Sequence, residues 1–137
     1  MGGVHFAQGN FSLALEDFRK ALELDPRDVR ACNNIGTALE RLGDYPAAEA
    51  AYGRAQQIDP LYPVTQRNLG ILLLRLGRPE AARRAWERYL ELAPSGAYAA
   101  EIRRELAAQA APTPTAAAPA APAPVPVPAP GAAPPAR

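Results

Sequence analysis

Small and apolar side chains recur along much of the chain with the spacing of helices. Over residues 29 to 42 they stand at i, i+3, i+4 and i+7, which places them on one face of a helix, and residues 46 to 58 repeat that spacing. The two sets are Cys32, Ile35, Gly36 and Leu39, followed by Ala48, Ala51, Tyr52 and Ala55. The pattern predicts two successive helices joined by a short turn at Gly43.

This helix pair recurs with a period of 34 residues. Glycine stands at positions 9, 43 and 77, where a left-handed residue ends a first helix. Proline stands at positions 26, 60 and 94, where it disfavours helical geometry at the preceding residue and ends a second helix. Small residues recur at Gly36 and Gly70 and at Ala14, Ala48 and Ala82, and aromatic rings recur at Phe18, Tyr52 and Trp86. The small residues allow adjacent helices to approach closely, and the rings fill the remaining space.

Glycine, alanine, an aromatic residue and proline at this spacing resemble the tetratricopeptide repeat, a 34-residue helix–turn–helix unit. The resemblance implies an all-α fold, a right-handed α-solenoid of antiparallel helix pairs. The repeats fall at about 1–28, 29–62 and 63–96. The first is truncated because only Met1 to Gln8 are available for its first helix, which suggests either a fragment or a misplaced start codon. Residues 97–109 predict a capping helix with Tyr98, Ile102 and Leu106 on its apolar face, so residues 1–110 are expected to form one domain.

Two departures from the family pattern carry expectations of their own. Cys32 replaces the usual tryptophan and is expected to be buried and unreactive. Tyr89 replaces an alanine, which predicts a re-packed end where the capping helix follows.

The resemblance implies that a peptide binds on the concave side of the array, against the first helix of each repeat. The family positions that face this side are here Arg30, Asn33, Asn34, Thr37, Glu40 and Arg41, and then Val64, Arg67, Asn68, Ile71, Leu74 and Arg75. Four arginines against one glutamate leave the surface positively charged, and guanidinium groups suit carboxylates. We therefore expect a protein or peptide partner with acidic side chains or a free C-terminus, lying on an apolar shelf of Val64, Ile71 and Leu74.

Structural interpretations compete with ligand binding at these positions. Asn34 and Asn68, one period apart, either grip the backbone of an extended ligand or tie neighbouring helices together. The arginines either contact a partner or belong to a solvated face. The two-carboxylate clamp of chaperone-binding members requires lysines at set places, and the only lysine here is Lys20, on a second helix.

Composition and charge remove several classes of function. Lysine plus arginine is 15 and aspartate plus glutamate is 14, so no bulk charge recruits nucleic acid, and the longest apolar run, Ile71 to Leu74, is too short to insert into a membrane. One cysteine and one histidine leave little for a metal site. His5 has no aspartate or cysteine partner in sequence, and Glu16 and Asp17 belong to a solvated face. With no nucleotide-binding or zinc-protease motif either, we expect no enzyme, no catalytic residue, no metal and no cofactor.

Residues 111–137 contain ten prolines and eleven alanines and are expected to form a disordered, extended tail. The leading interpretation of the whole chain is therefore a protein–protein interaction module that binds a peptide or protein tail. One alternative is a self-assembling scaffold or homodimer, formed through apolar residues that the truncated first repeat leaves uncovered, namely Leu13, Leu15, Phe18 and Leu22. A second alternative is an accessory domain of a larger enzyme. The absence of a leader pattern favours the cytoplasm, and 14 arginines against one lysine suggest a bacterial, GC-rich genome.

Overall fold

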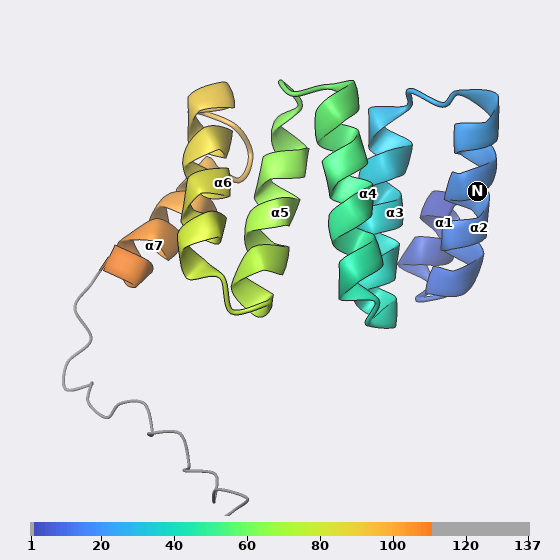
Figure 1. Ribbon diagram of the computed structural model, residues 1–137, viewed down its shortest axis with the longest axis horizontal. Coiled ribbons are helices and arrows are strands. Elements are labelled where there is room, and N and C mark those ends of the chain that lie inside the picture. Colours follow the sequence, from blue (N-terminus) through green and yellow to red (C-terminus); the bar gives the residue numbers. More distant parts are fainter. Residues whose placement is uncertain (1, 111–137) are drawn as a thin grey trace, which may run out of the picture.

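The computed structural model describes residues 2–110, and this part of the chain consists of helices joined by short turns. The helices are α1 (Gly2–Ala7), α2 (Phe11–Leu24), α3 (Val29–Leu42), α4 (Tyr45–Ile58), α5 (Pro63–Arg75), α6 (Pro79–Leu92) and α7 (Ala99–Ala110). They stack as antiparallel pairs in chain order, α1 with α2, α3 with α4 and α5 with α6, and α7 follows (Figure 1). The predicted all-α solenoid is confirmed. The prediction of a disordered tail lies outside the described residues.

The helix ends have local causes that the sequence contains. The three turn glycines, Gly9, Gly43 and Gly77, adopt left-handed φ angles of 79°, 85° and 75°. In this conformation the chain ends one helix and turns into the next without strain, because glycine has no Cβ. Asp28 begins α3 by accepting hydrogen bonds from the backbone N–H groups of Arg30 and Ala31, at 3.0 and 3.1 Å.

Within a pair, the two helices approach each other closely where a glycine of the first faces an aromatic ring of the second. Gly36 in α3 packs against Tyr52 in α4, and Gly70 in α5 packs against Trp86 in α6. A Cβ atom at either glycine would overlap atoms of the facing ring. Both rings are buried, so the close approach of the two backbones leaves no space between them. Gly36 and Gly70 therefore occupy matching places in neighbouring helix pairs.

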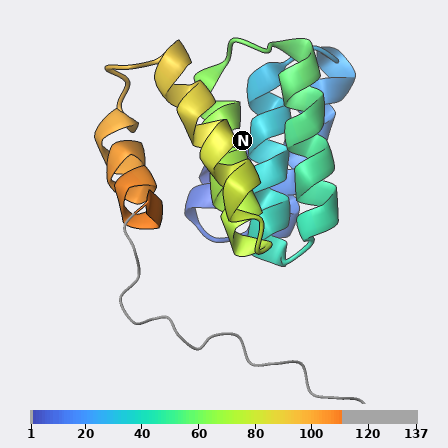
Figure 2. The ribbon, with the colours of Figure 1, turned by 60° about the vertical axis from the view of Figure 1, so that its left-hand side comes forward.

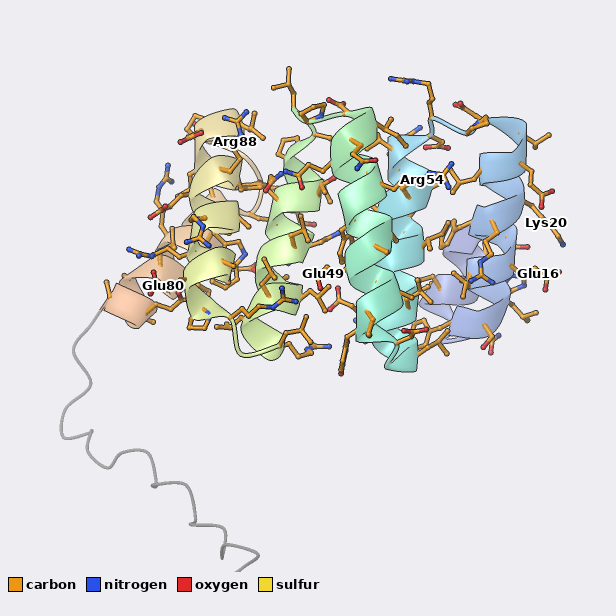
Figure 3. The ribbon with its side chains drawn as sticks, viewed as in Figure 1. Glu16, Lys20, Glu49, Arg54, Glu80 and Arg88 are labelled. Carbon is orange, nitrogen blue, oxygen red and sulfur yellow. The ribbon has the colours of Figure 1, made fainter. Side chains whose placement is uncertain are left out.

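The helices form two layers. The second helices of the pairs, α2, α4 and α6, lie on one side of the array, and α1, α3, α5 and α7 lie on the other (Figures 1 and 2). The layer of second helices carries exposed charges, several of them in ion pairs. Those labelled in Figure 3 are Glu16, Lys20, Glu49, Arg54, Glu80 and Arg88. Exposed ion pairs contribute little to stability, so this outer surface reads as a solvated face.

The end of the array is re-packed around Tyr89. Its ring is buried in a cluster with Trp86, Ala99 and Ile102, and its hydroxyl accepts a hydrogen bond of 3.2 Å from the backbone N–H of Tyr98. The tyrosine thereby holds the segment between α6 and α7. The capping helix starts at Ala99, two residues later than the predicted start at 97.

Candidate functional site: the groove on α3 and α5

A cavity of about 370 Å³ lies on the inner layer between α3 and α5. Its lining consists of Thr37, Glu40, Arg41, Tyr52, Arg67, Asn68, Ile71 and Arg75. Seven of the twelve positions that the resemblance places on the concave side are in this set: Thr37, Glu40, Arg41, Arg67, Asn68, Ile71 and Arg75. Leu74 lines an adjoining cavity that shares Ile71 and Arg75. We call the two cavities together the inner groove.

A buried polar network forms one wall of the groove. The Tyr52 hydroxyl donates to Oε1 of Glu40 at 2.6 Å, and Thr37 Oγ1 lies 3.1 Å from the same hydroxyl. Burial, together with the neighbouring Glu40 carboxylate, raises the pKa of Tyr52 well above its usual value. Tyr52 therefore remains a neutral donor, and it holds Glu40, which is only 9% exposed, against α4.

Two arginines stand at equivalent places in the last turns of α3 and α5. The guanidinium carbon of Arg41 lies 5.6 Å from the centre of the Phe11 ring, and that of Arg75 lies 5.9 Å from the Tyr45 ring. Each contact combines cation–π attraction with packing of the arginine stem. Arg75 also lies 3.7 Å from Oε2 of Glu40. Both arginines are exposed and line the groove, so they present positioned cations there.

Arg67 is engaged by the capping helix. Its guanidinium carbon lies 3.9 Å from the centre of the Tyr98 ring, and its Nη2 donates to Oε1 of Glu101 in α7 at 3.2 Å. The Arg67 carbonyl accepts from the Trp86 indole N–H at 3.2 Å. Arg67 therefore joins α5 to α6 and α7. Its charge is already paired, so the surplus positive charge expected for the groove is smaller than the sequence alone indicated.

Asn33, which was expected to bind the peptide, lines neither cavity of the groove. The side chain is 3% exposed, and its Nδ2 donates to Thr65 Oγ1 at 2.8 Å and to the carbonyl of Val29 at 3.1 Å. Because position 33 faces α5 rather than the solvent, its amide ties α3 to α5. Helical periodicity places both asparagines of α3 near the inner side but does not say which one meets the next helix.

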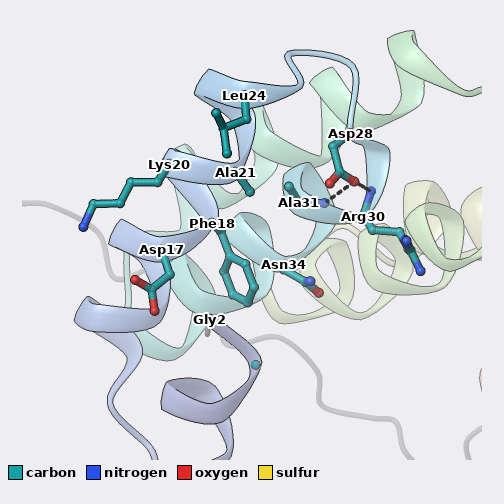
Figure 4. A pocket seen from close by; sticks show the side chains of 11 residues that line it. Gly2, Asp17, Phe18, Lys20, Ala21, Leu24, Asp28, Arg30, Ala31 and Asn34 are labelled. Carbon is teal, nitrogen blue, oxygen red and sulfur yellow. Dashed lines mark hydrogen bonds between the residues drawn. The ribbon is translucent and has the colours of Figure 1, made fainter.

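Arg30 and Asn34 line a different cavity, of about 540 Å³, between α1, α2 and α3. Phe18 and Leu24 line the same cavity and are labelled with them in Figure 4, and Leu24 is 90% exposed. Within residues 2–110 the side chain of Asn34 makes no hydrogen bond, so it does not tie neighbouring helices together. Apart from Asn33 and Val64, the predicted positions are thus divided between this cavity and the inner groove.

Four groove residues were missed by the sequence prediction: Tyr52, Trp86, Glu101 and Glu105. The two glutamates come from α7, which was interpreted only as a cap. The period contained a signal, because Glu101 and Glu105 stand 34 residues after Arg67 and Ile71. The two aromatic residues had been assigned to the core; both are buried, and they also belong to the lining of the groove.

The possible catalytic groups have structural partners. His5 Nδ1 lies 2.6 Å from Oδ2 of Asp17, which corrects the expectation that His5 lacks an aspartate partner and that Asp17 faces only solvent. The pair links α1 to α2, and in the described part of the chain no serine, threonine or cysteine is hydrogen-bonded to His5. Cys32 is 1% exposed, and burial raises the pKa of its thiol.

Among residues 2–110 no three metal-binding side chains stand together. The described helices are also too short or too polar to cross a membrane.

Comparison with known proteins identifies the repeat. Two sequence models of the tetratricopeptide repeat match the chain, over residues 1–63 and 39–106. The chain belongs to the tetratricopeptide repeat family. Comparison with curated protein sequences gives no significant match.

Solved tetratricopeptide repeat domains superpose on the chain. The first repeat domain of Spaghetti (RPAP3) bound to the HSP90 peptide SRMEEVD has 26% identity and a TM-score of 0.71, with 79% of this chain and 86% of that one covered. The first domain of human RPAP3 has 26% identity and a TM-score of 0.72, covering 78% and 84%. The type III secretion chaperone SycD of Yersinia enterocolitica has a TM-score of 0.73 at 20% identity, covering 78% and 77%, which shows the shared fold alone.

Proposed function

We propose that this chain is a non-catalytic interaction module whose inner groove binds an extended peptide through an acidic side chain or a free C-terminal carboxylate. The observation that carries the proposal is the cavity in which Arg41 and Arg75, held over aromatic rings, stand beside Asn68 and Ile71. Paired guanidinium groups bind carboxylates through charge-assisted hydrogen bonds.

The stacked helices favour binding because they place the groups in advance. A rigid array loses little conformational freedom when a ligand arrives, so most of the ordering cost falls on the peptide. Asn68 offers both a donor and an acceptor for a peptide backbone, and Ile71 offers an apolar surface. Together these groups suit a flexible segment of a protein partner better than a small molecule.

The similarity to the RPAP3 domain supports this class of ligand. That domain binds a peptide whose sequence, SRMEEVD, contains two glutamates and ends in aspartate. The present chain has Lys20 as its only lysine, and Lys20 lies on α2 in the other layer. The carboxylate-binding role therefore falls to the groove's own arginines, Arg41 and Arg75.

The proposal predicts the effect of neutralising these arginines. Peptides selected from a randomised dodecapeptide display library on the wild-type chain should be enriched in aspartate, glutamate or a free carboxyl end. The double substitution Arg41→Gln and Arg75→Gln should weaken their binding about tenfold or more, because two charge-assisted contacts are lost. Fluorescence anisotropy with a recovered peptide measures the change. Wild-type affinity should also fall as salt is raised.

The matched control removes two arginines from the other layer. Arg19 and Arg84 are exposed on α2 and α6 and line none of the three cavities described above. The double substitution Arg19→Gln and Arg84→Gln changes the net charge by the same amount and should leave affinity within about twofold. Equal losses in the two double variants, or recovered peptides with no acidic group, would contradict the groove assignment.

A second candidate function is self-association through the cavity between α1, α2 and α3. The observation that favours it is the open apolar surface formed by Phe18 and Ala21 beside the exposed Leu24. A second copy of the chain would cover this surface, and the resulting homodimer would act as a scaffold. This candidate does not involve Arg41 or Arg75, so it is tested separately.

A further inference from the structure

The second cavity of the inner groove differs in charge from the first. It measures about 370 Å³ and lies between α5, α6 and α7. Its lining combines three apolar or aromatic side chains, Ile71, Leu74 and Trp86, with the carboxylates of Glu101 and Glu105 and with Arg75. We call this space the α7 pocket. An apolar floor below two carboxylates suits a side chain that is long, apolar along its stem and positively charged at its end.

Some of the charged side chains that line the α7 pocket are already in contact with other residues. Arg75 lies on the boundary between the two cavities, but its guanidinium contacts Glu40 of α3 and Tyr45 of α4. Those contacts direct it toward the first cavity. Glu101 accepts a hydrogen bond from Arg67 and shares its charge with that arginine. Glu105, one helical turn further along α7, is exposed and makes no ion pair with any residue in the range 2–110. The carboxylate that remains available in this pocket is therefore that of Glu105.

We propose that the α7 pocket binds a lysine or arginine side chain of the same peptide that the groove binds through its acidic group. The stem lies against Ile71, Leu74 and the edge of Trp86, and the charged end meets Glu105. This inference rests on the proposed function and adds a second requirement to the ligand. An acidic side chain in the same place is repelled by two carboxylates, and an uncharged one leaves the charge of Glu105 without a partner.

The two cavities then select a direction as well as a composition. Arg41 lies on α3, Glu105 lies on α7, and Arg75 lies on α5 between them, so the charge along the groove changes from positive at α3 to negative at α7. A ligand with an acidic residue and a basic residue fits in one direction and meets like charges in the other. Electrostatic complementarity of this kind contributes more to specificity and register than to raw affinity. The partner is a bipolar protein segment rather than a uniformly acidic one.

The experiment is a selection on two proteins. The randomised dodecapeptide library is selected in parallel on the wild-type chain and on a Glu105→Lys variant. Wild-type peptides should carry an acidic group and a lysine or arginine at a constant separation from it. Peptides selected on the variant should keep the acidic group and lose the basic residue, or replace it by aspartate or glutamate. Glu105 is exposed, and circular dichroism verifies that each variant remains folded.

A double-mutant cycle then isolates the contact. A recovered wild-type peptide is compared with a copy in which its basic residue is alanine. The alanine copy should bind the wild-type chain about two- to fivefold more weakly, which is the range for a solvent-accessible ion pair. It should bind a Glu105→Gln variant no more weakly than the parent peptide does. The control Glu23→Gln, exposed on α2, should keep the wild-type difference.

The outcomes separate this inference from the function on which it rests. If replacing the basic residue of the peptide by alanine weakens binding equally on the wild-type chain and on Glu105→Gln, the α7 pocket is overturned and the groove remains in place. Wild-type selections without basic enrichment would overturn it too. Peptides that bind equally well after Arg41→Gln and Arg75→Gln would overturn the groove itself, and the pocket with it.

Discussion

At the scale of single residues, the fold depends on glycines that let rings fill the space between helices. Gly36 has no room for a methyl group because the ring of Tyr52 lies against it. That ring cannot move aside easily, since it is fully buried and its hydroxyl is bonded to Glu40. Gly53 in α4 offers the opposite case, because a Cβ there meets nothing within 4 Å. The same chemical change should therefore have opposite effects at the two positions.

We predict that Gly36→Ala destabilises the fold by about 1–2 kcal/mol, because overpacking outweighs the gain in helix propensity. Gly53→Ala should stabilise it by about 0.5–1 kcal/mol, since alanine restricts the unfolded chain and favours the helix. Urea denaturation followed by circular dichroism measures both. Midpoints that shift in the same direction would show that the contact with Tyr52 does not limit position 36.

The Tyr52 hydroxyl should stabilise the fold in a pH-dependent way. Tyr52→Phe leaves the buried Glu40 without its donor and should cost about 1–3 kcal/mol at pH 8. The folded state raises the pKa of Tyr52, so its contribution is complete below the unfolded value of about 10 and is lost as pH rises above it. Above that pH the unfolded chain releases a proton that the folded chain retains.

The measurement is the difference in unfolding free energy between wild type and Tyr52→Phe. It should shrink by about 1.4 kcal/mol between pH 8 and pH 11, because only the wild-type chain carries this ionisation. Comparing the two proteins at each pH removes the effects of the other tyrosines and of lysine. A difference that stays constant over this range would contradict the raised pKa.

At the scale of elements, α7 both closes the array and shapes the groove. Ile102 is buried against Trp86 and Tyr89, so the helix covers the apolar end of α6. Glu101 of α7, and Tyr98 directly before the helix, contact Arg67. A terminal cap in a repeat protein needs one apolar and one wet face, and here the wet face also borders the inner groove.

Arg67→Ala should loosen α7 selectively. The substitution removes the contacts with Tyr98 and Glu101 but leaves the packing of α3 on α4 unchanged, so amide hydrogen exchange in α7 should accelerate about tenfold. Arg104→Ala, on the exposed side of the same helix, serves as the control and should have little effect. Exchange that accelerates equally in α3 and α7 would show that Arg67 supports the whole array instead of its end.

At the scale of the whole molecule, several charged residues of the outer layer form ion pairs with one another, whereas several of those in the inner layer line the groove. The outer layer holds ion pairs that its own helices satisfy, such as Lys20 with Glu16. The inner layer holds Arg41 in the first cavity, Glu105 in the α7 pocket and Arg75 on the boundary between the two. A near-neutral chain, with 15 basic and 14 acidic residues, thus presents a locally charged groove. Net charge alone gives no indication of this arrangement.

Self-association is tested at the same scale. If a second copy covers the cavity at the first repeat, sedimentation velocity should show a dimer whose fraction rises with protein concentration. Leu24→Lys should abolish it, because the exposed leucine would be replaced by a charge at the centre of the contact. Leu61→Lys, at another exposed leucine, should not. A monomer at every concentration would exclude this second candidate function.

The sequence by itself determined the repeating architecture. Glycine, alanine, aromatic residues and proline at a 34-residue period specify turns, close contacts and helix ends, and these are local or nearest-neighbour properties. That is why the left-handed φ at Gly43 and the contact of Gly36 with Tyr52 follow from spacing alone. The inner position of Arg41, Asn68, Ile71 and Arg75 follows from the resemblance to the repeat family, whose first helices line the concave side.

Only the tertiary structure decided how the inner side chains are divided between packing and surface. Asn33 and Asn34 are neighbours on one helix, yet one is tied to Thr65 and the other is exposed. Likewise Arg67 and Arg75 lie on the same helix, and only Arg67 is taken up by α7. These differences arise between side chains from separate repeats, whose mutual positions depend on how the helices pack. A one-dimensional period indicates which face a residue occupies, but the partner that meets it there is set by the three-dimensional array.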